Sequence, residues 1–260
     1  MPPKPSRQHV APVLRRLGFR SVTPLRKPLL SKVNRAKRLN FARKMASQDW
    51  SQVIFSDEKI FRVRPGARVK CWRMASESKF LPKYIMPTVQ KAEGLMVWAA
   101  MKSSGAISLR RCPPKLNAAG YQDILASAKP FIATRCDSDT LKRLFTSFSY
   151  LRARGWRFQQ DGAPPHRALT TQAWLRRNRI RLLNSGFWPP MSPDLNPIEH
   201  VWPLVLRNLK GAVFSGREQL WTALQEAFAA ITPSEIQRLY ASMPERLACV
   251  RAQKGGPTRY

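Results

Sequence analysis

Acidic side chains are scarce in this sequence: 15 Asp and Glu stand against 46 Lys and Arg, a formal net charge of +31. A folded domain with such an excess of one sign repels itself unless a polyanion neutralises it. DNA or RNA is the natural partner, because each phosphate contact by Lys or Arg also releases condensed counterions. A protein that merely coats nucleic acid, as ribosomal or chromatin proteins do, has the same charge. Composition therefore predicts the partner and leaves the activity open.

Cysteines and long apolar runs are also sparse. The cysteines show no C-x-x-C pair, which argues against a structural zinc site or a disulfide framework and favours reduced thiols in an intracellular protein. They are Cys71, Cys112, Cys136 and Cys249. The longest apolar stretches, residues 95–101 and 201–206, are far too short to cross a bilayer, so we expect no membrane partner. The N-terminus is basic and proline-rich without an apolar core, unlike a secretory signal.

Enough apolar sequence is present to build a core. Apolar residues make up 43% of the 260 residues and aromatic residues 10%. A chain of this length accommodates one sizeable catalytic domain and a small appendage.

The first 50 residues differ from the rest, since they hold 13 Lys and Arg and a single acid, Asp49. An apolar face within residues 7–17 predicts a helix that stops at Gly18. Pro12 indicates that only the later part of this helix is regular, or that it begins near Pro12. Two prolines predict an extended linker over residues 21–30. Residues 31–46 again suit a helix.

This second helix has an apolar stripe and many cations. Its predicted inward face is Val33, Ala36, Leu39 and Ala42. The cations off that stripe suit a solvated face, a nuclear-localisation patch or a phosphate-binding surface, and their density and single sign favour the last. The candidate DNA contacts of the N-terminal region are Arg15, Arg16, Arg20, Lys32, Arg35, Lys37 and Arg38.

From residue 50 onward, β-type runs come first and then alternate with helical patterns. This order predicts an α/β fold with a mixed sheet flanked by helices. The predicted strands are residues 52–55, 59–63, 95–101, 106–111, 156–160 and 180–183. The predicted helices are residues 121–134, 167–177, 197–210, 217–230 and 233–240. The tail after Lys254 is expected to be loose.

Three acids stand where predicted elements begin or end. Asp57 follows an apolar strand, Asp161 ends another, and Glu199 opens a helix after a proline-rich loop. Strand ends and a helix packed on the sheet can bring the three together, where neighbouring carboxylates resist joint ionisation. Two Mg²⁺ ions, about 3.5–4 Å apart, would relieve that repulsion, activate a water and stabilise the leaving oxygen in phosphodiester cleavage.

Position alone is also compatible with purely structural roles for these acids. A strand-end Asp is more often a turn former than a ligand, and Glu199 can be a charge favoured by the dipole at a helix N-terminus.

Three blocks around these acids resemble a known family. They are VIFSDE at residues 53–58, FQQDGAPPH at 158–166 and WPPMSPDLNPIEHVW at 188–202. In the same order, they resemble the signature blocks of transposases of the mariner superfamily (Tc/mariner), and the third block is the most specific. The resemblance spans residues 5–250. It implies an RNase H-like fold and a DDE transposase that cuts and joins DNA ends with two Mg²⁺ or Mn²⁺ ions.

The resemblance also implies roles for individual residues. Asp57, Asp161 and Glu199 match the metal ligands of the family. His166 matches a histidine that holds a phosphate or the geometry of the site, although a turn-stabilising role is also open. Asp194 would brace its loop, and Asn196 would cap the helix that carries Glu199.

The N-terminus matches the family only in part. Residues 8–30 resemble the end of the second of two helix-turn-helix modules, so we expect an N-terminally truncated copy. The expected domains are a helix-turn-helix remnant at 1–24, a basic linker helix at 25–50, an RNase H-like DDE catalytic domain at 51–250 and a loose tail at 251–260. The implied partners are the terminal inverted repeats of a transposon, TA target sites and a second copy of the chain, and the implied location is the nucleus.

Three departures from the family pattern bear on activity. Asp161 and Glu199 are separated by 37 residues, more than is common, with the excess in the 183–188 loop. Gly162 stands where Asn is usual. Pro203 inside a helix begun near residue 197 would kink it beside Glu199, whereas a helix begun at Glu199 itself would ease this problem. The alternative function is therefore a truncated or domesticated DNA-binding protein with lost or weak catalysis.

Overall fold

The structure is a computed structural model of the chain. It describes residues 7–20, 27–63, 74, 76–78, 81, 94–128, 131, 156–209, 212 and 214–260. The helices are α1 (Arg7–Arg16), α2 (Lys32–Lys44), α3 (Ala118–Ser127), α7 (Pro164–Arg167), α8 (Leu169–Arg177), α9 (Val201–Asn208), α10 (Arg217–Ala229), α11 (Pro233–Ala241) and α12 (Met243–Ala252). The short 3-10 segments are η1 (Trp50–Gln52), η3 (Leu183–Gly186), η4 (Pro193–Leu195) and η5 (Pro197–His200). The strands are β1 (Val53–Arg62), β2 (Gly94–Met101), β3 (Ile107–Arg111) and β4 (Arg157–Phe158).

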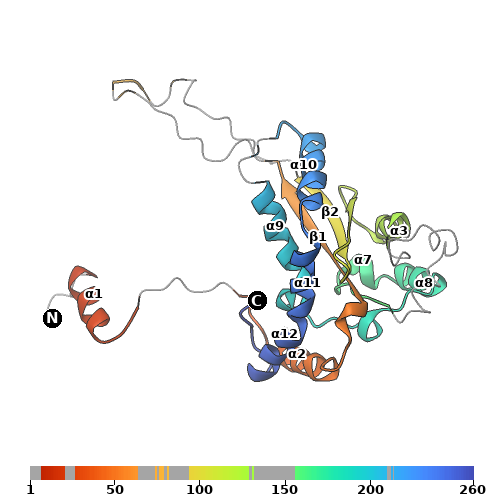
Figure 1. Cartoon of the computed structure of the whole chain (residues 1–260), viewed down its shortest axis with the longest axis horizontal. Helices are drawn as coiled ribbons and strands as arrows, with labels where there is room; N and C mark the ends of the chain where they lie inside the picture. The colour runs from red at the N-terminus through yellow and green to blue at the C-terminus, as the bar shows by residue number, and fades with distance from the viewer. Residues whose placement is uncertain are drawn as a thin grey trace.

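The strands form one mixed sheet in the order β3-β2-β1-β4 (Figure 1). Strands β1 and β2 pair antiparallel, as do β2 and β3, whereas β4 runs parallel to β1. The predicted hairpin over residues 95–111 and the predicted mixed α/β sheet are confirmed.

The prediction of two short strands around Asp57 was wrong. A single strand, β1, runs through both, and Asp57 pairs with Ala99 of β2 in its middle. The partner strand continues to supply hydrogen bonds across the polar residues 56–59, so the strand does not end where the apolar run ends. Two other strands are shorter than predicted: β4 has two residues, and residues 180–183 contribute only a bridge between Leu182 and Phe158.

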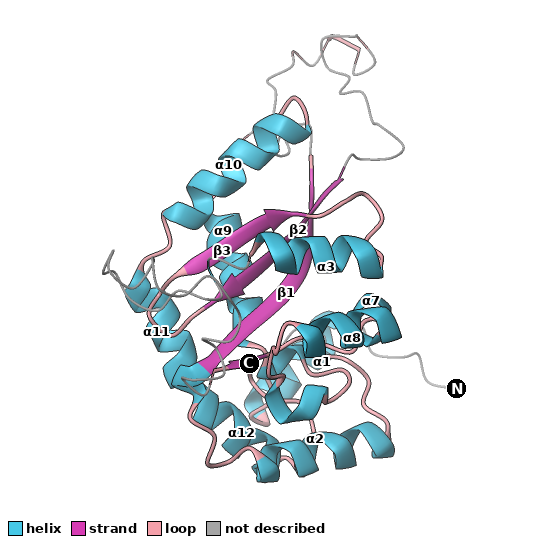
Figure 2. Cartoon of the chain, turned by 90° about the vertical axis from the view of Figure 1, so that its right-hand side faces the viewer, coloured by secondary structure: helices cyan, strands magenta, loops and turns pink. Residues whose placement is uncertain are grey.

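Helices cover both faces of the sheet (Figure 2). Side chains alternate along a strand, so Val53 and Phe55 pack with α9, α10, α11 and α12, while Ile54 and Trp98 pack with α3 and α8 on the other face. Helices α2, α10 and α11 confirm their predictions, and α12 was not predicted. Helix α3 begins earlier than predicted, and the end of its predicted range lies largely outside the described residues. Helix α8 begins two residues later than predicted, after the separate turn of α7.

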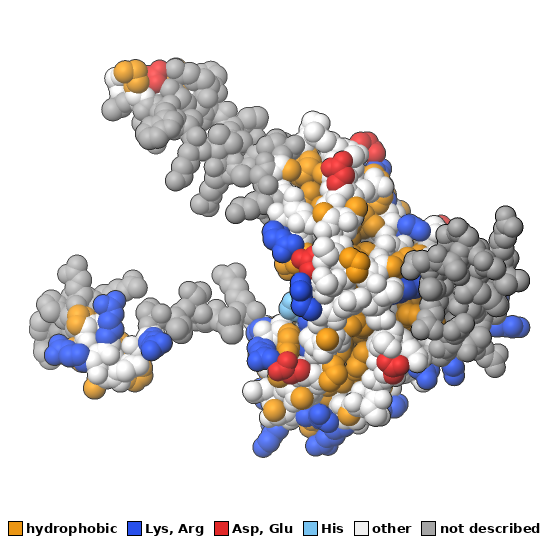
Figure 3. All heavy atoms as spheres, viewed as in Figure 1, with side chains coloured by type: hydrophobic (Ala, Val, Ile, Leu, Met, Phe, Trp, Pro, Cys, Tyr) orange, Lys and Arg blue, Asp and Glu red, His pale blue; other side chains and the backbone are white. Residues whose placement is uncertain are grey.

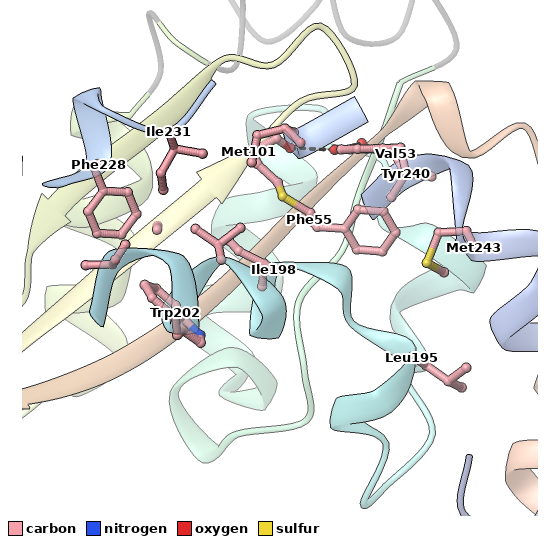
Figure 4. Close-up of a cluster of buried hydrophobic side chains, with 14 of the residues drawn as sticks. Val53, Phe55, Met101, Leu195, Ile198, Trp202, Phe228, Ile231, Tyr240 and Met243 are labelled. Carbon is pink, nitrogen blue, oxygen red and sulfur yellow. Dashed lines mark hydrogen bonds between the residues drawn. The ribbon is translucent and has the colours of Figure 1, made fainter. Parts of the chain in front are cut away.

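The first of these two cores anchors the segment that carries Glu199. Ile198 and Trp202 are almost completely buried and point into the cluster that contains Phe228 and Ile231 (Figure 4). The Tyr240 hydroxyl lies 2.8 Å from the carbonyl oxygen of Val53 and 2.7 Å from that of Met101. The apolar packing thus holds η5 and α9 against the sheet, and Tyr240 joins α11 to β1 and β2.

The predicted helix over residues 197–210 is in fact two elements. The 3-10 segment η5 comes first, and α9 begins only at Val201. Pro203 is therefore the third residue of α9, where the backbone N–H would have no partner within the helix in any case. The predicted kink beside Glu199 does not occur.

The inward face predicted for α2 is partly confirmed, because Ala42 is buried and Leu39 is half-buried, whereas Val33 and Ala36 are exposed. The rest of the buried face is Arg38 and Phe41. The prediction for the tail was wrong. The tail is not loose: α12 continues to Ala252, and Gly255, Gly256 and Thr258 are buried.

Helix α1 has the predicted bounds and stands apart from the sheet and its helices in Figure 1. The expectation drawn from Pro12 was wrong, because the helix begins at Arg7 and contains this proline. Over the described residues, no helix is long and apolar enough to cross a membrane. Cys112 and Cys249 are free thiols, while Cys71 and Cys136 lie outside the described residues.

Candidate active site

The three acids singled out in the sequence line one open cleft of about 650 Å³. Asp57 reaches it from the centre of the sheet, Asp161 from the turn after β4, and Glu199 from η5. Lys37 of α2 and Arg167 of α7 also line it, as does the loop over residues 186–193. Residues far apart in the sequence thus converge on one surface depression.

Asp57 is held on the face of β1 that is covered by α9. The indole Nε1 of Trp202 donates a hydrogen bond to its Oδ2 at 2.9 Å. Burial, together with the nearby charge of Glu199, raises the pKa of Asp57 from 3.8 to about 7. The sequence analysis assigned Trp202 no role. Its position at the end of the third block, three residues after Glu199 and so on the same side of a helix, was the signal that could have identified it.

Glu199 has a similar environment. It lies between the buried Ile198 and the first turn of α9. Burial is the main cause that raises its pKa, the charge of Asp161 adds to the shift, and the Lys59 ammonium opposes it. Asp57 and Glu199 therefore form a part-buried pair: the charge of Glu199 raises the pKa of Asp57, while a hydrogen bond with Asp57 lowers the pKa of Glu199.

Asp161 is tied to the chain around it. Its Oδ1 accepts hydrogen bonds from the backbone N–H of Ala163 at 2.9 Å and from His166 Nδ1 at 2.7 Å. Burial acts to raise the pKa of Asp161, but these hydrogen bonds outweigh it and the pKa is lowered.

His166 links two acids. Its Nε2 lies 3.3 Å from Oε1 of Glu58, and its ring lies 4.1 Å from that of Tyr121. Burial lowers the pKa of His166, but the hydrogen bonds to Asp161 and Glu58 raise it to about 9. His166 therefore orients Asp161 from within the fold, which is the second of the roles left open for it.

The donor set of the cleft suits a hard divalent cation, which prefers carboxylate and amide oxygens. Asp57 and Glu199 present two neighbouring carboxyl groups to the cleft. The buried Oδ1 of Asn196, another lining residue, has no hydrogen-bond partner in the described part of the chain. No three His, Cys, Asp or Glu side chains of that part already converge on a single point.

Asp194 lies near this cleft, but its carboxylate is engaged in contacts within the fold. Arg38 of α2 donates to both of its carboxylate oxygens at 2.7 Å, and Thr258 donates to Oδ2 through its hydroxyl at 2.9 Å. Arg38 also donates to the carbonyl oxygens of Gly255 and Gly256. We call this cluster of Arg38, Asp194, Gly255, Gly256 and Thr258 the tail lock.

The tail lock braces the loop before Glu199, as the resemblance implied for Asp194. Asn196 is placed as the N-cap of η5, but its side chain makes no capping bond and instead donates to the carbonyl oxygen of Ser56 at 3.2 Å. It therefore joins the loop to β1.

Candidate DNA contacts fall into two groups. Arg15, Arg16 and Arg20 lie on or just after α1, and Lys32, Arg35 and Lys37 are exposed on α2. Lys and Arg side chains gather over both helices in Figure 3. Arg38 is a correction: it is completely buried in the tail lock, so it cannot contact a phosphate. Arg167, which the sequence did not single out, lines the cleft beside Asp161.

Two protein families match this chain. Residues 52–221 match the DDE superfamily endonuclease family, and residues 3–47 match a helix-turn-helix family described as a transposase. The Tcb1 transposase of Caenorhabditis briggsae is 33% identical over 263 residues, which cover 99% of this chain and 89% of that protein. The Tc1 transposase of Caenorhabditis elegans is 33% identical with the same coverage.

Solved structures share the fold. The Mos1 transposase paired-end complex with the left transposon end superposes with a TM-score of 0.73 at 21% identity, over 98% of this chain and 72% of that one. The catalytic domain of Mos1 mariner transposase superposes with a TM-score of 0.66 at 19% identity, over 90% of this chain and all of that one.

Proposed function

This chain belongs to the Tc1/mariner family of transposases with a DDE endonuclease domain, and we propose that it is an active enzyme that cuts and joins transposon DNA ends. Asp57, Asp161 and Glu199 are the proposed catalytic residues. The observation that carries the proposal is the part-buried pair of Asp57 and Glu199 in the cleft, which contrasts with Asp194, an acid paired with the buried Arg38.

The residues around the cleft would each have a defined task. Trp202 holds Asp57 in place, and His166 with Ala163 fixes Asp161 at the cleft edge. Lys37 and Arg167 provide positive charge on the walls, where the phosphates of a DNA strand would lie.

We propose that the three acids hold two Mg²⁺ or Mn²⁺ ions. Such ions, when bound, activate a water or a 3′-hydroxyl and stabilise the leaving oxygen in phosphodiester displacement. Solved Mos1 paired-end complexes with Mn and with Mg support this choice of cation.

The proposed partner is double-stranded DNA, specifically terminal inverted repeats and a TA target. The +31 net charge supports DNA binding, and Mos1 is solved bound to a transposon end. Because two ends must be held together, we propose that the chain acts as a homodimer, and that it works in the nucleus where its DNA is. We propose a helix-turn-helix remnant at 1–24, a linker helix at 25–50 and a catalytic domain from residue 51, and that residues 251–260 belong to this last domain, which the tail lock supports.

The alternative, a DNA-binding protein without catalysis, is less well supported than the sequence suggested. Its main ground was the expected kink at Pro203, and Pro203 lies in the first turn of α9 without disturbing η5. Gly162 is a mild departure, because it has no left-handed backbone and a side chain there would meet only the Arg167 Cδ at 3.9 Å.

A cleavage assay tests the proposal. The chain, fused to an end-recognition module, is incubated with end-bearing DNA and Mg²⁺ or Mn²⁺, beside a Glu199→Gln variant as the matched control. Strand cuts at the transposon ends by the parent and not by the variant are the expected result. Absence of cutting by the parent with either ion contradicts the proposal.

A further inference from the structure

The loop that precedes the third sequence block has an unusual backbone. Asn184, Ser185 and Gly186 follow one another in the left-handed region, with φ of 48°, 56° and 85°. Residues with a Cβ adopt this conformation at an energetic cost, and such strain persists only where the surrounding structure enforces it. This is also the stretch that lengthens the spacing between Asp161 and Glu199.

The fold holds this loop firmly on both sides of Phe187. Leu183 is buried in the core before it. After it, the Trp188 ring meets Phe41 of α2 edge to face at 5.2 Å. The Asn184 side chain also donates to the carbonyl oxygen of Phe187 at 3.2 Å. The backbone of Phe187 is therefore fixed.

The Phe187 side chain itself is not packed into the core. It is 41% exposed and lines the same cleft as the three acids. Met191, 49% exposed and also left-handed at φ 54°, extends this apolar wall. A strained, anchored loop thus presents an aromatic ring to solvent inside the cleft that also holds the three acids, Lys37 and Arg167.

The other walls of the cleft restrict what can bind the ring. Lys37 and Arg167 supply positive charge, and Asp57, Asp161 and Glu199 supply the acids. A nucleic acid strand is the ligand that brings phosphates for the cations and flat, apolar faces for the ring. Base faces inside a duplex are covered by their neighbours, so only a base that has left its stack can lie on Phe187.

We propose that Phe187 is a stacking platform for an unpaired base of the DNA strand held in the cleft. The inference rests on the proposed function, since it assumes that DNA occupies the cleft. It adds a ligand subsite that holds the strand through a base and not through its phosphates. The ring would position the strand and take no part in bond breaking.

The experiment uses the full chain and a short DNA duplex with a single-stranded overhang that carries 2-aminopurine at its first unpaired position. Fluorescence is read with chelator present, so that cutting is not required. Stacking on Phe187 is expected to quench the probe, and Phe187→Ala is expected to lose that quenching while Phe187→Trp retains it. Base–aromatic stacking contributes about 1–3 kcal/mol, so Phe187→Ala should bind the overhang DNA about 5- to 150-fold more weakly and blunt duplex equally well.

Leu206→Ala is the matched control, because Leu206 is 52% exposed on α9 and does not line the cleft. The Leu206→Ala variant should quench the 2-aminopurine fluorescence as strongly as the parent does. Equal quenching by the parent and Phe187→Ala overturns the inference. A changed oligomeric state of Phe187→Ala with quenching intact also overturns it, because the ring would then be a contact between copies of the chain. Quenching by a parent that fails to cut DNA with metal supports the platform and counts against the proposed catalysis alone.

Discussion

Two aspartates near the same loop, Asp57 and Asp194, have opposite electrostatic surroundings. Asp194 is paired with the completely buried Arg38 and accepts further bonds from Thr258, and although burial opposes it, these partners lower its pKa. Asp57 faces another acid, Glu199, and its pKa rises to about 7. One carboxylate is fully neutralised by the fold, and the other is left without a counter-charge of its own.

The difference separates a structural acid from a functional one. A buried charge is costly unless it is paired, so a fold under selection for stability alone would pair both. Asp194 has that pairing and fixes the tail and α2 to the loop. Burial and the charge of Glu199 favour the neutral form of Asp57, and a divalent cation would stabilise its charged form, which is why we propose Asp57 and Glu199 as metal ligands.

The largest expected effect comes from substituting the functional acid. Asp57→Asn should reduce the DNA cleavage rate at least about a thousandfold. Losing a residue that only hydrogen-bonds to a metal ligand costs less, about 10- to 100-fold. Trp202→Phe removes such a hydrogen bond and should fall within that smaller range. Cleavage rates under saturating Mg²⁺ give both values, and equal losses for the two variants would contradict the assigned roles.

Next in size is the effect of breaking the tail lock. Asp194→Asn leaves Arg38 buried without its counter-charge and should lower the free energy of unfolding by about 3–5 kcal/mol. Denaturant unfolding measures this loss. Arg35→Gln, on the exposed side of the same helix, is the control and should change stability by less than about 0.5 kcal/mol. A small effect of Asp194→Asn would show that the lock is not structural.

The two acids should also differ in how they make stability depend on pH. The pKa of Asp57 is raised in the folded protein, so its contribution to stability is greatest below about pH 4 and is lost as pH rises toward 7. Asp194 acts in the opposite sense, because its pKa is lower in the folded protein than in the unfolded chain. Its contribution to stability is therefore present above the unfolded pKa and is lost as pH falls through the folded pKa. In metal-free buffer, Asp57→Asn should therefore be more stable than the parent near pH 7, by on the order of 2–4 kcal/mol. Unfolding curves at several pH values test this, and identical pH profiles for parent and variant would refute it.

The smallest effects belong to two positions beside these acids. Thr258→Val removes hydroxyl donation to Asp194 while Arg38 remains, so the free energy of unfolding should fall by about 1 kcal/mol.

Gly162→Ala restricts the unfolded chain at a position whose backbone does not require glycine, and it should stabilise the protein by about 0.4–1 kcal/mol. Thermal unfolding distinguishes the two signs, and a destabilised Gly162→Ala would mean that the turn beside Asp161 needs glycine.

Part of this arrangement was predictable from sequence, because local patterns carry it. The hairpin, the helices after residue 216 and the convergence of Asp57, Asp161 and Glu199 follow from periodicity and from the three motif blocks. Asp57 was misplaced at a strand end, since four polar residues interrupt the apolar run and only pairing with β2 carries the strand through them.

The tail lock was not predictable, because its partners are far apart in the chain. Arg38 has the signature of a surface cation, and the Gly-Gly-Pro sequence of the tail has that of a loose end. Only the tertiary fold reveals that Gly255, with φ of 83°, passes so close to α2 that a Cβ would lie 2.0 Å from the Arg35 carbonyl oxygen. Long-range pairing of this kind leaves no local pattern in either segment.

The contrast between the two aspartates is tested most directly by the thermal unfolding midpoint as a function of Mn²⁺ concentration near neutral pH. A ligand that binds only the folded state stabilises it by about 2.7 kcal/mol at a hundredfold excess over Kd. Mn²⁺ should raise the midpoint of the parent and, from a lower starting value, that of Asp194→Asn, but not that of Asp57→Asn. An equal rise in Asp57→Asn and the parent would contradict the assignment of Asp57 and Glu199 as a cation site.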